Sequence, residues 1–130
     1  MRQLICGFLL ASLISPSFAA GGGGGTTPYL EIPTPFVVNL ADKGALSFLQ
    51  VNAQLKMARQ DVKQHLFLHM PAIQHAIMMV LSEQTTDDIK SVAGKQKLRE
   101  TTLKEVQTLL EEKIGDPAVD EIYFTGFIIQ

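Results

Sequence analysis

The stretch V-D-E-I-Y-F-T-G-F-I-I-Q, residues 119–130, decides the predicted fold because β-branched and aromatic side chains dominate it. From Ile122 onward the two alternating sets of side chains are both largely apolar: Ile122, Phe124, Gly126 and Ile128 in one, and Tyr123, Thr125, Phe127 and Ile129 in the other. A strand that is apolar on both faces is usually covered on both. We therefore expect this strand at the centre of a sheet. The alternative is that one aromatic face of the strand is a docking surface.

A second extended segment, residues 46–57, shows the clearest alternation in the chain. Its apolar side chains are Leu49, Val51, Ala53, Leu55 and Met57, separated by Gln50, Asn52, Gln54 and Lys56. One apolar and one polar face are typical of a half-buried antiparallel strand. The segment P-F-V-V-N-L at 35–40 precedes it across the turn A-D-K-G, which predicts a β-hairpin. Residues 29–32 are expected to form a short edge strand.

Helical periodicity fills the middle of the chain. It predicts one helix over residues 61–70 and a second over 71–81, with Pro71 at the first position of the second helix. Because a proline restricts the residue before it, we expect Met70 to leave helical geometry.

A long amphipathic helix is predicted over residues 95–114. Thr85 and Ser91 are expected starting points for helices in this region, and Gly115 is expected to end the long one. The order is therefore strands, helices and a closing strand. This order predicts an α+β fold, in which helices pack on one face of a largely antiparallel sheet.

The first twenty residues have the three-part pattern of a secretory signal. A short basic lead precedes an apolar run over residues 4–14, and small residues stand at Ser17 and Ala19. Cleavage is then expected after Ala19 or Ala20. The alternative is a short membrane anchor that is not cleaved, although the apolar segment is shorter than the roughly 20 residues that span a bilayer.

The remaining chain divides into a glycine-rich linker over residues 21–28 and a domain over 29–130. Cys6, the single cysteine, lies inside the N-terminal segment, so cleavage would leave a protein without a disulfide. Thirteen acidic residues stand against eleven basic ones, and this balance does not favour nucleic-acid binding.

The search for chemical motifs identifies no catalytic, cofactor-binding or metal-ligating residue, so we expect no enzyme. His65 and His69 are four residues apart, but they lack a carboxylate at the spacing of a zinc motif. The pair Gly94-Lys95 lacks the other residues of a phosphate-binding loop. Four methionines are expected to fill the core rather than line a binding groove: Met57, Met70, Met78 and Met79.

Three segments in order carry a family resemblance. They are P-F-V-V-N-L at 35–40 with the alternating strand that follows it, P-A-I-Q-H-A-I-M-M-V-L-S-E-Q-T-T-D-D-I-K-S-V-A-G-K-Q-K-L-R at 71–99, and I-Y-F-T-G-F-I-I-Q at 122–130. With these segments the chain resembles the flagellar basal-body-associated FliL family, in its periplasmic domain, over residues 29–130.

The resemblance implies a fold similar to the stomatin-like (SPFH) domain and a function without catalysis. Family members are single-pass inner-membrane proteins that associate with the flagellar motor, contact its stator units, and are thought to form rings around them. They support torque, swimming or swarming. The start of this chain departs from the family pattern, since its apolar segment is short and a glycine run replaces the usual linker.

We therefore expect a periplasmic accessory protein of the flagellar basal body, whose partners are further copies of itself and the stator proteins. Membrane association would come through the N-terminal segment. The alternative is a periplasmic ligand-binding module unrelated to motility, which would have an apolar pocket beneath its helices.

Overall fold

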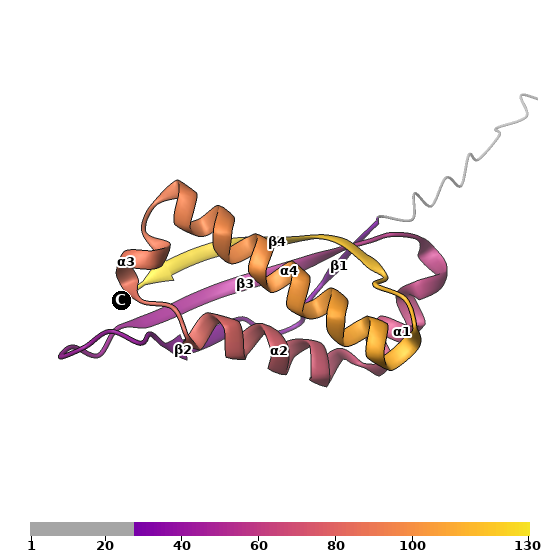
Figure 1. Ribbon diagram of the computed structural model, residues 1–130, viewed down its shortest axis with the longest axis horizontal. Helices are drawn as coiled ribbons and strands as arrows, with labels where there is room; N and C mark the ends of the chain where they lie inside the picture. The colour runs from indigo at the N-terminus through magenta and orange to yellow at the C-terminus, as the bar shows by residue number, and fades with distance from the viewer. Residues whose placement is uncertain (1–27) are drawn as a thin grey trace, which may run out of the picture.

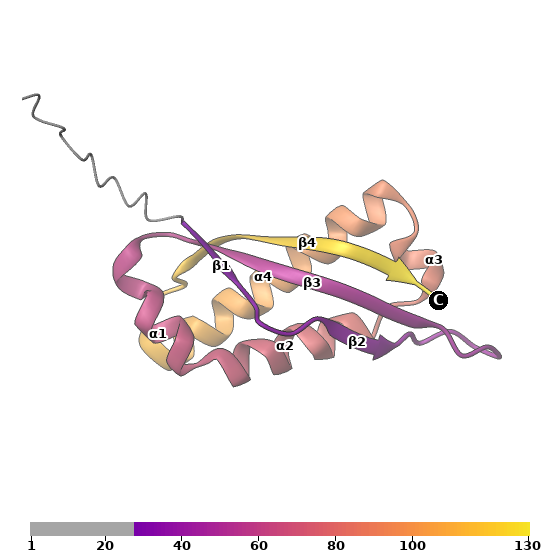
Figure 2. The same ribbon diagram turned by 180° about the vertical axis from the view of Figure 1, so that it is seen from behind.

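The computed structural model describes residues 28–130, in which an antiparallel sheet lies under a layer of helices (Figure 1). Seen from behind, the strands lie in front of α2 and α4, so these two helices cover one face of the sheet and leave the other open (Figure 2). The predicted α+β class, with helices on one face, is confirmed.

In chain order the elements are β1 (Tyr29–Glu31), β2 (Phe36–Asn39), β3 (Phe48–Met57), η1 (Gln60–Val62), α1 (Lys63–Leu68), α2 (Met70–Ser82), α3 (Thr86–Ile89), α4 (Val92–Ile114) and β4 (Val119–Ile129). The predicted cleavage positions Ala19 and Ala20 lie outside the described residues.

Strand β3 is the centre of the sheet. The short strands β1 and β2 pair with it along one side, and β4 pairs with it along the other, all antiparallel. The predicted hairpin between β2 and β3 is confirmed by the register, in which Phe36 lies opposite Val51. The expectation that residues 119–130 form the central strand is wrong. Within the described sheet, β4 pairs with β3 alone and is an edge strand.

A β-bulge at Gly126 explains why β4 looked like a strand buried on both faces. The pairing steps from Asn52–Thr125 to Gln50–Ile128, so β4 holds one residue more than β3 across this interval. Gly126 has a φ of 60°, a left-handed conformation that favours glycine. Side chains alternate between the two faces of a strand, so the extra residue moves every side chain after the bulge to the opposite face from the one that simple alternation predicts. The residues packed towards the core are therefore Ile122 and Phe124 before the bulge, and Phe127 and Ile129 after it.

The core lies between the sheet and the two long helices. The apolar side chains of β3 predicted to be buried are buried, and Leu49, Val51, Ala53 and Leu55 have no exposed surface. Helix α2 covers them with Ile73, Ile77 and Leu81, and α4 with Leu98, Val106 and Leu110. Thr102 is also buried on α4, where its hydroxyl donates to the carbonyl oxygen of Leu98 over 2.7 Å.

The break between α1 and α2 falls at His69, whose φ and ψ are −100° and 11°. Met70 is the first residue of α2, so the expectation that it leaves helical geometry is wrong by one position. Pro71 lies in the first turn, where its missing N–H removes no intrahelical hydrogen bond. The chain therefore bends one residue earlier than the proline rule predicted.

Side-chain caps define the helices that follow. The Thr85 side chain and the Asp88 side chain form a reciprocal capping box at the start of α3. Ser91 caps α4, which begins at Val92, three residues before the predicted start. Gly115 ends α4 in a left-handed conformation with a φ of 71°, as expected.

Candidate functional site

The histidines do not gather into a site. His65 and His75 are exposed, and His69 lies at the break between α1 and α2. Across residues 28–130, no group of three or more His, Cys, Asp or Glu side chains is placed to hold a metal ion.

Gly94 allows two backbone segments to pack closely. It lies in the first turn of α4, where that turn crosses the backbone of α3. A Cβ atom at this position would lie 1.7 Å from the carbonyl oxygen of Asp88. Only glycine allows the two backbones to approach this closely.

Two of the four methionines are not in the core. Met57 and Met70 are buried as predicted, but 41% of Met78 and 48% of Met79 are exposed on α2. The helical period explains the difference, because Ile77, Val80 and Leu81 take the inward positions and turn the residues between them outward.

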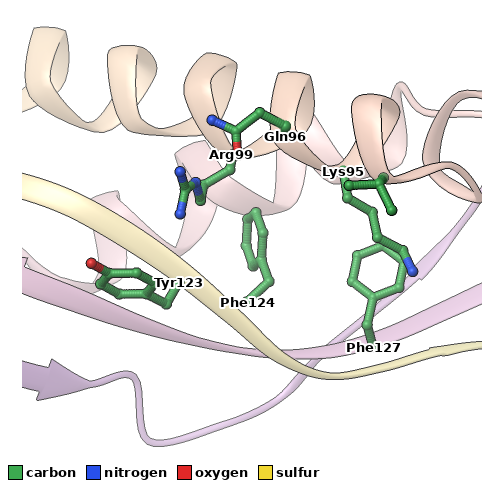
Figure 3. Close-up of a pocket in the computed structure, with 7 residues that line it drawn as sticks. Lys95, Gln96, Arg99, Tyr123, Phe124 and Phe127 are labelled. Carbon is green, nitrogen blue, oxygen red and sulfur yellow. The ribbon is translucent and has the colours of Figure 1, made fainter.

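A groove lies between the first turns of α4 and the outer edge of β4 (Figure 3). It has a volume of about 410 Å³. We call it the edge groove. Helix α4 contributes polar and cationic side chains, and β4 contributes three aromatic rings. The residues labelled in Figure 3 are Lys95, Gln96, Arg99, Tyr123, Phe124 and Phe127.

Aromatic rings hold both cations of the edge groove in place. The Lys95 ammonium lies 5.0 Å from the centre of the Phe127 ring, and the Arg99 guanidinium carbon lies 5.8 Å from the centre of the Tyr123 ring. Each contact stabilises its cation by about 0.5–1 kcal/mol at an exposed site. The Nε of Arg99 is buried, and it has no hydrogen-bond partner in the part of the chain that the structure describes. The groove therefore combines an aromatic wall with two cationic side chains.

Two further hollows lie at the surface. One, of about 470 Å³, runs between the start of β2 and α2, where the Gln74 amide donates to the Thr34 hydroxyl over 3.3 Å. The other, of about 300 Å³, lies between the end of α2 and α4. In contrast, fully buried side chains such as Leu66, Ile73 and Ile77 fill the space beneath the helices, where the ligand-binding alternative placed its pocket.

Two partly buried carboxylates hold loops in place through hydrogen bonds. Asp42, in the turn before β3, accepts hydrogen bonds from the Thr86 hydroxyl and from the Thr86 N–H, the latter over 2.8 Å. These bonds lower the pKa of Asp42, the hydroxyl contributing most. Asp116 accepts from Arg59, and this contact lowers the pKa of Asp116. Both carboxylates join segments that are distant in sequence.

Sequence reasoning missed the edge groove, although its components were visible. Lys95 and Arg99 are one helical turn apart and lie on one face of α4. Their apposition to Tyr123 and Phe127 depends on how α4 crosses the edge of the sheet, which no local pattern records.

The residues that the structure describes contain no helix long and apolar enough to cross a membrane. In a comparison with known proteins, the family model of the flagellar basal body-associated protein FliL matches residues 29–130. A curated relative, the flagellar protein FliL of Aquifex aeolicus (strain VF5), is 34% identical over 100 residues. The match covers 77% of this chain and 60% of the length of that relative.

Proposed function

Since the chain belongs to the FliL family of flagellar basal-body-associated proteins, we propose that it is a non-enzymatic accessory of the flagellar motor. It acts by binding, and it supports torque during swimming or swarming. The observation that carries this proposal is the extent of the family match, which covers the whole folded domain.

The proposed place of action is the periplasm at the basal body. Export would use the N-terminal segment, which is then cleaved after Ala19 or Ala20 or retained as an inner-membrane anchor. In both cases the domain would lie beside the motor, with a fold of the stomatin-like type.

The proposed partners are further copies of the chain, arranged in a ring, and the stator proteins. A one-sided domain supports such an arrangement, because it leaves a sheet face and both sheet edges available (Figure 2). The open face carries exposed apolar side chains at both ends: Tyr29, Val37, Phe48 and Ile128. Exposed apolar surface of this kind is a common feature of interaction sites.

Deletion of the gene tests the proposal. We expect slower swimming in viscous medium, reduced swarming, or lower torque per motor under load, each restored by a plasmid copy of the gene. Normal motility at every load and viscosity would refute the proposed function. The intact mass of the protein purified from its host distinguishes a cleaved form, lacking residues 1–19 or 1–20, from an anchored one.

A further inference from the structure

The outer edge of β4 offers backbone hydrogen-bonding groups to a partner. The carbonyl oxygen of Ala53 accepts from the N–H of Ile32, on the β1 side of the sheet. In an antiparallel sheet, the residue opposite Ala53 on β4 then directs its own N–H and C=O away from β3. That residue is Phe124. The same alternation applies to Ile122, which lies opposite Leu55, and no hydrogen bond found within residues 28–130 engages these outward groups.

Helix α4 roofs this edge. In both views its first turns extend past β4 before the helix crosses back over the sheet (Figures 1 and 2). The volume of about 410 Å³ lies under this overhang. Further along, the Gln107 amide donates to the carbonyl oxygen of Val119 over 2.8 Å, and this contact closes the groove at the start of β4. A chain added beside β4 would therefore run under the helix.

The chemistry of the overhang selects an acidic occupant. Lys95 and Arg99 face the groove, while Glu100, the neighbouring acid on α4, accepts a hydrogen bond from Gln96 over 2.8 Å. Arg99 is a permanent cation at the groove, and a carboxylate is the acceptor that matches a guanidinium group best. Phe124 and Phe127 provide an apolar wall for the stem of such a side chain.

We propose that the edge groove binds an extended acidic segment of a partner protein, which adds to β4 as a further strand and places a carboxylate against Arg99 and Lys95. Strand addition of this type draws affinity from main-chain hydrogen bonds and specificity from alternate side chains. The bulge at Gly126 and a second irregularity between Val119 and Glu121 limit the regularly paired part of β4 to residues 121–125. The inference extends the proposed function by naming a surface and the chemistry of its partner.

Binding of designed peptides to the protein purified from its host tests the proposal. The probe is a fluorescein-labelled heptapeptide, T-V-E-V-E-V-T, whose affinity is measured by fluorescence anisotropy. One control replaces both glutamates with lysine, and another replaces the central valine with proline, which cannot donate to a strand ladder. We expect the acidic probe to bind about tenfold more tightly than either control. Equal affinity for the acidic and lysine peptides would overturn the charge assignment.

Two variants with matched charge locate the site. Arg99→Met is expected to weaken the acidic probe about fivefold, because it removes the carboxylate partner. Lys104→Met removes an exposed cation outside the groove, and it should change the affinity less than twofold. Lys95→Met serves as a second groove variant if Arg99→Met unfolds. Probe binding should also slow hydrogen exchange at the amides of Ile122 and Phe124. Unchanged exchange there would overturn strand addition.

Two outcomes separate this inference from its alternatives. If the same amides become protected as the protein concentration rises without peptide, the occupant is a second copy of the chain and the acidic-segment proposal is wrong. If deletion of the gene impairs motility but the two groove variants complement it fully, the inference fails and the proposed function stands. If the peptide binds as expected but deletion leaves motility normal, the proposed function fails and the groove remains a peptide site.

Discussion

At Gly94, helix propensity and tertiary packing predict opposite effects for substitution by alanine. Alanine favours the interior of a helix by about 0.8–1.0 kcal/mol over glycine. The new Cβ would, however, lie 1.7 Å from the carbonyl oxygen of Asp88, far inside the 3.0 Å below which real Cβ atoms are essentially never found. Because the opposing atom belongs to the backbone, α3 and α4 must separate.

The cost of that separation follows from what α3 buries. Ile89, at the end of α3, has no exposed surface. Exposing a side chain of this size costs about 1.5–3 kcal/mol. After subtraction of the propensity gain, we expect Gly94→Ala to destabilise the domain by about 1–2 kcal/mol. For a domain of this size, that loss lowers Tm by roughly 5–15 °C.

Urea unfolding followed by circular dichroism measures the change in the free energy of unfolding. Ala93→Gly, at an exposed neighbour in the same turn, makes the reverse exchange and should cost no more than about 1 kcal/mol. Ile89→Ala should cost about 2–5 kcal/mol in the wild type. It should cost clearly less in the Gly94→Ala background, because the side chain is already exposed there. A Gly94→Ala protein as stable as the wild type, or additive costs in the double variant, would refute the reasoning.

Three further predictions concern the sheet and its loops. In the same urea assay, Leu55→Ala, in the fully buried face of β3, should lower the free energy of unfolding by about 2–5 kcal/mol. The control Leu46→Ala, at a position that is 82% exposed, should change it by less than about 0.5 kcal/mol. Removal of residues 127–130 should lower the free energy of unfolding by about 2–3 kcal/mol, because this end of the edge strand is only partly buried. The shortened protein should still unfold cooperatively. A non-cooperative thermal transition would show that these residues are essential to the core. The pKa of Asp42 is lowered by Thr86, so its contribution to stability is complete above the ordinary value of 3.8 and is lost as pH falls through the lowered value. Between these two pH values, Tm should fall less steeply in Asp42→Asn than in the wild type, and equal slopes would contradict the assignment.

Local patterns predicted most of the domain because most of its elements record their environment in their own sequence. The alternation along β3 identified the covered face of the sheet, and the polar caps at Thr85 and Ser91 located two helix starts. The family resemblance, which rested on three segments in order, was confirmed by the match over residues 29–130.

The failures occur where a long-range contact or a single backbone conformation decides the structure. The prediction that β4 lies at the centre of the sheet was wrong because an alternating pattern does not reveal the extra residue at the Gly126 bulge. Without the bulge, both faces of the strand are read as apolar. The edge groove was missed for a related reason. Its walls meet only because α4 crosses the sheet edge, and no local pattern in the sequence records that crossing.

The opposite placement of the ends of β1 and β4 has a mechanical consequence. Tyr29 begins β1 beside Lys56, at one end of β3, and Ile129 ends β4 beside Leu49, at the other end. A force that pulls these two points apart runs parallel to the strands. The ladder hydrogen bonds lie perpendicular to the strands, so such a force loads them together in shear rather than peeling them apart one at a time. The unfolding rate governs the lifetime of a domain under force. Pulled along this axis, the domain should therefore outlast one whose strands unzip.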